Sequence, residues 1–119
     1  MSAETAILLA LAIPLAGGSL AMHFGHCEQF AIIETDEAGN ILSREDIVPP
    51  AHAPGVLPEW LGELNVTHII AGGMGSRAQN LFSQKGITTI VGAHEGNPEE
   101  LVKACVEGTL KTGENICDH

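Results

Sequence analysis

The chain has 119 residues, of which 45% are hydrophobic and 17% charged, and this size and composition are typical of one globular domain with a sizeable core. Fifteen acidic residues against five basic ones give a formal net charge of −10, and the basic residues are scattered along the sequence. Nucleic acids and anionic membranes bind to clustered lysine and arginine, so the composition argues against both as partners. Three cysteines without regular spacing favour reduced thiols in a cytoplasmic protein, with a Cys27–Cys117 disulfide as the alternative.

The apolar segment 6–22 is the first element along the chain. A signal peptide carries positive charge before its apolar stretch, but Glu4 is the charged residue here. A membrane span needs about 20 apolar residues, and Pro14 and the Gly17-Gly18 pair interrupt this segment early. We therefore expect a buried strand over 7–13 that ends before Pro14 and leads into a loop.

The remaining elements follow from hydrophobic periodicity and from turn and capping residues. Strands are predicted over 29–35, 41–48, 66–71 and 87–91, and helices over 59–64, 77–85 and 97–108, with Ser76 as N-cap of the second helix and Asn97 as N-cap of the third. Residues 36–40 form the turn of a hairpin, and residues 109–119 are expected to be an irregular tail of a single domain spanning 1–119.

The predicted order is strand–strand–strand–helix–strand–helix–strand–helix. This order predicts an α/β fold with a five-stranded mixed sheet and flanking helices, resembling a ribonuclease-H-like topology. The first, fourth and fifth strands should run parallel, and their carboxyl ends lead into residues 14–28, 72–76 and 92–96. Ligands of such sheets bind at the carboxyl ends of the parallel strands, so we expect these three loops to form the site.

The first of these loops contains His23, His26 and Cys27, and the chain ends with Cys117 and His119. Imidazole and thiolate are ligands for zinc, copper and metal–sulfur clusters, although the spacing matches no zinc-finger pattern. Eleven extended tail residues span roughly 35 Å, so the tail can return to the first loop and complete a four-ligand site. Alternatively, the loop only leads into the next strand and the tail is a solvent-exposed terminus.

The second loop is Gly72-Gly73-Met74-Gly75, followed by Ser76 and Arg77. It lacks the spacing of a P-loop or a dinucleotide fingerprint, but backbone N–H groups at a helix N-terminus offer an anion site to which Arg77 adds charge. The alternative is a tight turn that needs glycine for steric reasons. Met74 is a possible soft ligand, although methionine at such a position more often packs.

Other candidates carry less information. His68 is predicted to be a core or edge residue and Cys105 an inert residue on a buried helix face, while His94 lies at the expected edge and His52 has no assigned role. Strand 7–13 has no acidic residue for the two Mg²⁺ ions of a nuclease. A thiol-dependent enzyme would require a reactive Cys27 with a low pKa.

Two segments of the sequence resemble a known family. HFGHCEQFAIIE, from His23, and IIAGGMGSRAQNLFSQKGI, from Ile69, are similar to signatures of the dinitrogenase iron–molybdenum cofactor biosynthesis family, of the NifX and NifB C-terminal type. The resemblance covers nearly the whole chain from Ala6 onward, with the segments in the expected order, and residues 97–110 match the family's final helix.

The resemblance implies a ribonuclease-H-like fold without nuclease activity, and a role in binding or carrying cofactor precursors and related metal–sulfur clusters, so we expect a carrier and not an enzyme. Small stand-alone members of the orange-protein type carry a molybdenum–copper–sulfur cluster. By position, the resemblance implicates His23, Gly72, Gly73, Met74, Gly75 and Arg77 in cofactor binding. We therefore predict a cytoplasmic carrier of a cluster containing Mo, Fe or Cu, with His23, His26, Cys27, Cys117 and His119 as metal ligands.

Its expected partners are the metal cluster itself and a cluster-donor or cluster-acceptor protein. The alternative is a regulatory or interaction domain with a structural zinc site or no metal. Because the clusters are anionic and the chain carries −10, cluster binding requires a locally positive pocket. An acidic edge would favour a bare cation such as zinc.

Overall fold

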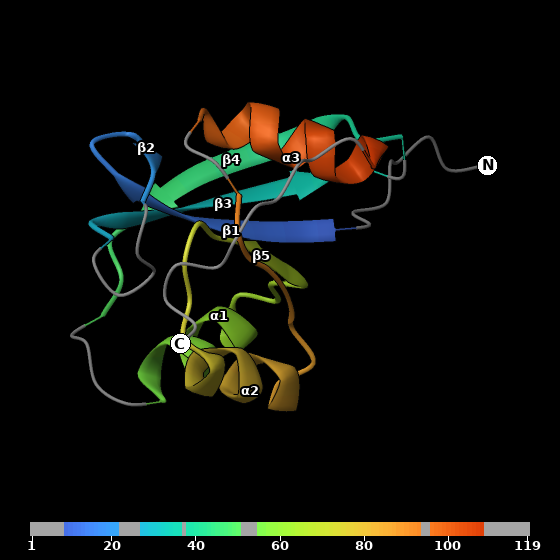
Figure 1. Ribbon diagram of the computed structural model, residues 1–119. Helices are drawn as coiled ribbons and strands as arrows, with labels where there is room; N and C mark the ends of the chain where they lie inside the picture. Colours follow the sequence, from blue (N-terminus) through green and yellow to red (C-terminus); the bar gives the residue numbers. More distant parts are fainter. Residues whose placement is uncertain (1–8, 22–26, 37, 51–54, 94–95, 109–119) are drawn as a thin grey trace.

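The computed structural model describes residues 9–21, 27–36, 38–50, 55–93 and 96–108. These residues form an α/β fold with a mixed six-stranded sheet and three helices (Figure 1). In chain order the elements are β1 (Leu9–Ala16), β2 (Ser19–Leu20), β3 (Gln29–Thr35), β4 (Ile41–Ile47), α1 (Val56–Glu63), β5 (His68–Ile70), α2 (Ser76–Gln84), β6 (Thr88–Ile90) and α3 (Pro98–Glu107).

The strands lie in the order β4-β3-β1-β5-β6, with β2 paired to β1. β3 and β4 form an antiparallel hairpin, β3 is antiparallel to β1, and β1, β5 and β6 are mutually parallel. The predicted α/β class and the parallel set are therefore confirmed, and β2 is an additional short strand. The ribonuclease-H-like assignment stays a prediction.

Helices cover both faces of the sheet (Figure 1). Each face carries a separate hydrophobic core. The helix-pair core, beneath α1 and α2, contains Ala12, Phe30, Ile32, Leu57, Leu61, Val66, Ile69, Ala71, Met74, Phe82 and Ile87. The α3 core, on the other face, contains Leu11, Ile13, Leu15, Leu20, Ala31, Ile33, Ile70, Ala93, Leu101 and Val102. Consecutive residues of β1 and β3 alternate between the two cores because successive side chains of a strand point to opposite faces.

The first strand differs from its prediction, because it continues through Pro14 to Ala16. The Pro14 carbonyl accepts a hydrogen bond of 2.8 Å from the Ala21 N–H. In an extended residue the nitrogen and the carbonyl point to the same side, so the proline nitrogen faces β2 and the ladder to β3 loses no donor. The prediction that this strand ends at Ile13 is wrong for this reason.

Helix boundaries also shift. α1 begins at Val56 rather than Glu59, since Pro58 lies in the first turn, where a helix needs no N–H donor. α2 has Gly75 as its N-cap, so the prediction of Ser76 as N-cap is wrong. α3 is confirmed: the Asn97 side chain accepts a hydrogen bond of 2.9 Å from the Glu99 N–H, and Gly108 ends the helix with φ 77°.

Candidate functional site

The loops at the carboxyl ends of the parallel strands are joined by backbone hydrogen bonds. The Gly92 N–H donates to the Gly72 carbonyl at 2.8 Å, which holds the loop after β6 beside the loop after β5. The Leu20 N–H donates to the Gly96 carbonyl at 3.2 Å, which joins β2 to the segment that precedes α3. The predicted convergence of three loops at one sheet edge is thus confirmed for their described residues.

The glycine loop places Met74 in the helix-pair core rather than in solvent. Gly72 and Gly73 are buried, and the Met74 side chain is 1% exposed. Its carbonyl accepts a hydrogen bond of 3.0 Å from the Gln79 side-chain amide, which ties the loop to the first turn of α2. Within the loop, backbone groups rather than the Met74 thioether are therefore suited to face a ligand.

The N-terminus of α2 has no side-chain cap, in contrast to that of α3. Gly75 has an ordinary extended conformation (φ −66°, ψ 154°), and a Cβ built on it would meet no atom within 4 Å. Neither backbone strain nor a neighbouring atom of the described chain therefore requires glycine at this position, so the tight-turn interpretation does not explain Gly75. The open position leaves the first N–H groups of the helix accessible to an anion.

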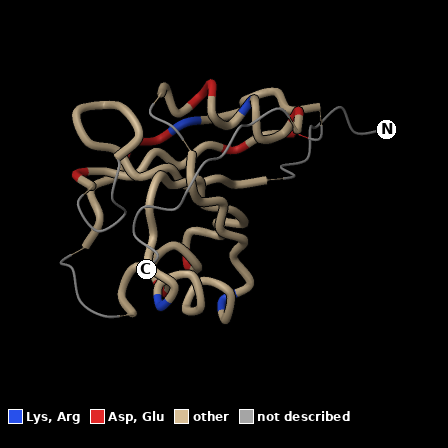
Figure 2. The backbone as a smooth tube through the Cα atoms, in the orientation of Figure 1, with Lys and Arg blue, Asp and Glu red and all other residues tan. Residues whose placement is uncertain are grey.

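The charge on this part of the fold is consistent with an anionic ligand. Arg77 is exposed in the first turn of α2, and the helix contains no acidic residue. Figure 2 shows that many acidic residues of the described chain lie around β3, β4 and α3, while α1, which packs beside α2, also carries Glu59 and Glu63. The positive charge near the α2 N-terminus therefore comes from Arg77, whereas Glu28 places a carboxylate next to Cys27 at the same sheet edge.

Cys27 precedes β3 at the same sheet edge. The next residue, Glu28, donates its N–H to the Leu15 carbonyl at 2.7 Å, and this bond fixes the segment against the end of β1. Cys27 is a free, half-buried thiol that packs against the helix-pair core. Burial raises the pKa of the Cys27 thiol, although a backbone hydrogen bond partly opposes the shift.

This direction is opposite to the low pKa that a nucleophilic cysteine needs. It therefore weighs against the thiol-dependent enzyme.

Most of the predicted metal ligands lie outside the described residues. Of the five, Cys27 is described, whereas His23, His26, Cys117 and His119 are not, and neither are His52 and His94. Within the described ranges, no group of three or more histidine, cysteine or acidic side chains could hold a metal ion. The metal-ligand set stays a prediction.

His68 has a structural environment. Its Nδ1 lies 2.8 Å from the Thr67 hydroxyl, which donates to the Ala10 carbonyl and accepts from the Ala10 N–H. The tautomer of the ring decides which group donates in this contact, and burial lowers the pKa of the ring. This environment agrees with the expected core or edge role.

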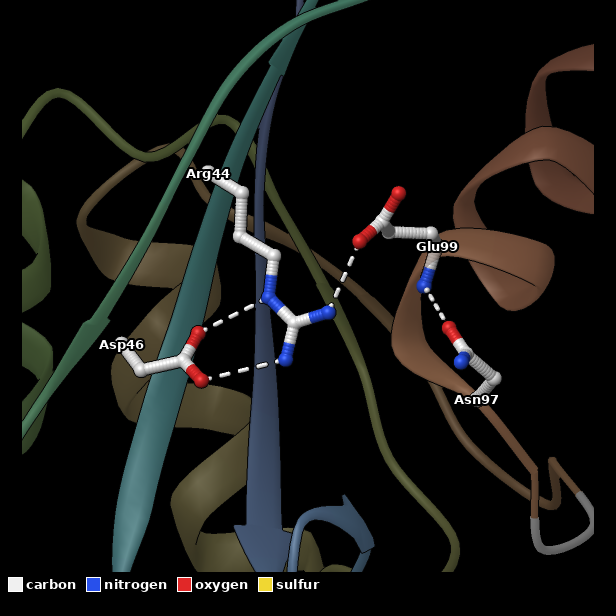
Figure 3. A network of polar contacts seen from close by, with 4 residues as sticks. All are labelled: Arg44, Asp46, Asn97 and Glu99. Carbon is white, nitrogen blue, oxygen red and sulfur yellow. Dashed lines mark hydrogen bonds and ion pairs between the residues drawn. The ribbon is translucent and has the colours of Figure 1, made fainter.

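Arg44 forms a network that the sequence did not reveal (Figure 3). Its Nε and Nη2 donate to the Asp46 carboxylate at 2.9 and 3.1 Å, and its Nη1 donates to Glu99 at 2.9 Å. The network joins β4 to the first turn of α3, next to the Asn97 cap. The i, i+2 spacing of Arg44 and Asp46 on a strand was the available signal, because it places both side chains on one face.

A family model described as dinitrogenase iron-molybdenum cofactor matches residues 6–108. The chain belongs to this family. Its members are mostly non-catalytic domains of cofactor biosynthesis or carriage, which suggests a role in metal-cluster assembly.

Several known proteins are similar to this chain. An uncharacterized protein of Methanocaldococcus jannaschii is 33% identical over 109 residues, covering 87% of this chain and 91% of the relative. The crystal structure of PH0822 has a TM-score of 0.82 at 24% identity and covers 90% of this chain and 96% of its own. The apo form of the orange protein from Desulfovibrio gigas has a TM-score of 0.70 at 18% identity, covering 92% and 98%. At these identities, the two structures show a shared fold.

No helix among the described residues is long and apolar enough to cross a membrane.

Proposed function

We propose that this family member binds a metal–sulfur cluster at the carboxyl edge of its parallel strands and carries it in the cytoplasm between a donor and an acceptor protein. The observation that carries the proposal is the pairing of an uncapped α2 N-terminus with a half-buried cysteine segment at one sheet edge. Family membership supplies the class of cargo.

Two kinds of contact would hold the cluster. The backbone N–H groups after Gly75 and the Arg77 guanidinium suit its anionic sulfide or oxo groups, and Gly72 and Gly73 keep the adjoining loop free of side chains. The Cys27 thiolate would bind a metal atom, together with His23 and His26 and with Cys117 and His119 of the tail.

Because the Cys27 thiol is protonated at neutral pH, metal binding would release a proton, and cluster affinity should rise with pH.

An anionic cluster of Mo, Fe or Cu suits this edge better than a bare zinc ion. Arg77 and the positive end of the α2 dipole attract an anion, and α2 contributes no carboxylate that would attract a cation. A regulatory or interaction domain, with a structural zinc or no metal, is the second candidate and is separated by the experiment below.

The test is elemental analysis and a visible spectrum of protein purified without oxygen, and again after reconstitution with metal and sulfide. We expect Mo, Fe or Cu with a charge-transfer band that is lost in Cys27→Ser and retained in Cys105→Ser. Cys105 is a matched control because it is also free and half-buried with a raised pKa, but packs against the α3 core on the other face.

Stoichiometric zinc without colour would favour the structural-site function. A colourless, metal-free protein after reconstitution would refute cluster carriage and leave the interaction domain.

A further inference from the structure

β4 forms one edge of the sheet, and its outer side pairs with no strand of the described chain (Figure 1). It is seven residues long, whereas β6 at the opposite edge has three. Leu42 and Val48 are 41% and 68% exposed and are the large hydrophobic side chains that the described chain leaves in solvent. An exposed edge of this length, with an apolar residue near each end, is suited to pairing with another strand.

We propose that two copies of the chain associate by antiparallel pairing of β4 with β4, centred on Glu45, so that their sheets become continuous. In this register, the numbers of opposing residues sum to 90. The regular part of β4 runs from Ser43 to Ile47, and there Arg44 lies opposite Asp46 of the partner subunit. Leu42 is the extra residue of the bulge at the start of β4 and Val48 follows the strand, so Leu42 and Val48 of the partner subunit lie at the same end of the interface. Each pair occurs twice, since the interface is two-fold symmetric. The exposed apolar residues thus come together at the two ends of the interface, and opposite charges face each other at its centre.

The positions of the charged side chains support this register. Arg44 and Asp46 lie opposite Ile33 and Ala31 of β3, which belong to the α3 core, so both side chains are on the α3 face. The contacts with Asp46 and Glu99 use three of the five guanidinium N–H donors and hold the Arg44 head on this face (Figure 3). Two donors remain for Asp46 of the partner subunit.

Neighbouring registers are less favourable. In a continuous sheet the partner strand can shift by two residues at a time, which moves the centre of the pairing by one residue and keeps each side chain on its own face. Centring on Arg44 places two guanidinium groups opposite each other, and centring on Asp46 places two carboxylates opposite each other. The second shift also brings the bulge at Leu42 near Pro50, which has no N–H to donate. The proposed register has one like-charge pair, Glu45 with its own copy, on the face opposite Arg44.

The helices leave room for the pairing. α3 packs over β3, one strand in from the edge. With strands about 4.8 Å apart, the two α3 helices would lie roughly 14 Å apart on the same face of the continuous sheet. Packed helices approach to about 8–10 Å, so the two copies of α3 would not collide.

Sedimentation velocity of the full chain, from about 10 μM to 1 mM, tests the proposal. We expect a reversible monomer–dimer equilibrium that Val48→Lys weakens about tenfold and that Glu45→Gln tightens about threefold, because the like-charge pair is removed. Thr88→Lys, an exposed position on the opposite edge strand, should leave the equilibrium unchanged.

A charge-swap mixture tests the register itself. Glu45→Lys mixed in equal amount with the unaltered chain should form heterodimers in excess of the statistical half, since lysine then faces Glu45. Glu63→Lys, which changes the net charge equally on α1, should show no excess. An unaltered chain that stays monomeric throughout overturns the proposal, as does a dimer indifferent to Val48→Lys. A statistical mixture of Glu45→Lys overturns the register.

Discussion

Replacing Gly75 with serine separates the stability of α2 from the binding role proposed for its N-terminus. Gly75 already has the extended conformation of an N-cap residue, and the space for a Cβ is open. Serine would supply the missing side-chain cap, worth a few tenths of a kcal/mol relative to glycine. Reduced freedom of the unfolded chain adds about 0.4–1 kcal/mol. The two gains together raise the free energy of unfolding by about 1 kcal/mol, or the melting temperature by about 4 °C.

Cluster binding should change in the opposite direction. The serine hydroxyl would accept one of the helix N–H groups that the anion needs, and the loss of one hydrogen bond to a charged group weakens binding by about tenfold or more. Stability is measured by urea and thermal unfolding of the metal-free protein, followed by the fluorescence of Trp60, the single tryptophan of the chain. Cluster affinity is measured by visible absorbance during reconstitution.

Gly55→Ser is the matched control. Gly55 is the N-cap of α1, and a Cβ there also meets no atom within 4 Å, but its φ is 81°. A residue other than glycine in this left-handed region costs about 1–2 kcal/mol, so Gly55→Ser should be destabilised while Gly75→Ser is stabilised. A Gly75→Ser protein that unfolds more easily than the unaltered chain would refute the structural argument. One that is stabilised but takes up cluster normally would refute the binding role.

Three further predictions concern other parts of the fold. Gly39→Ala should lower the free energy of unfolding by about 2 kcal/mol, because φ is 86° and the added Cβ would lie 2.9 Å from Val106 Cγ1. Adding Val106→Ala should recover part of this loss, as measured by urea unfolding. Losses that simply add would contradict the clash. Hydrogen bonds from Asn40 and Ala38 lower the pKa of Asp36. The stabilising effect of Asp36 is therefore present above the unfolded pKa of about 3.9 and is lost as pH falls through the folded pKa. The stability of Asp36→Asn should depend less on pH below about pH 4 in acid unfolding, and an unchanged pH profile would contradict the assignment. In the metal-free protein, burial should make Cys27 react with iodoacetamide more slowly at pH 8 than in the urea-unfolded chain, and the rate should rise at higher pH. Peptide mapping by mass spectrometry measures this rate. A faster reaction in the folded protein would contradict the raised pKa.

Local sequence signals predicted the elements that tertiary context does not alter. The strand Gln29–Thr35 was predicted with its observed bounds, because β-branched and aromatic residues are bounded by turn formers. The Asp36–Asn40 turn closes through the Asp36 N–H donating to the Asn40 carbonyl at 3.1 Å. Asn97 and Pro98 marked the start of α3, since a cap and a first-turn proline act locally.

Where the prediction failed, the outcome depends on how strands pair, which no local sequence signal shows. Pro14 ends a strand only if its nitrogen faces a strand that needs a donor, and the sequence does not show that this side faces β2. β2 itself is two residues long and exists because it pairs with β1. Pairing with neighbours also shortens the predicted strand 66–71 to His68–Ile70.

The position of the candidate site in the fold could be predicted from the sequence, but its detailed geometry could not. The order of parallel strands sufficed to bring the loops after β1, β5 and β6 to one edge. The burial of Met74 depends on Phe82 and the rest of the helix-pair core, which no local pattern specifies. The uncapped state of α2 follows from Gly75 taking the N-cap position that a propensity argument gives to Ser76.

The two cores give the fold two separate sources of stability. Cys27 and Met74 belong to the helix-pair side, and none of the described candidate site residues lies in the α3 core. Free-energy losses from Leu61→Ala on one side and Val102→Ala on the other should therefore add, because neither side chain contacts the cavity left by the other. Substitutions in the α3 core can therefore lower the stability of the fold while leaving the proposed site unchanged, so stability and the proposed cluster binding can be altered separately.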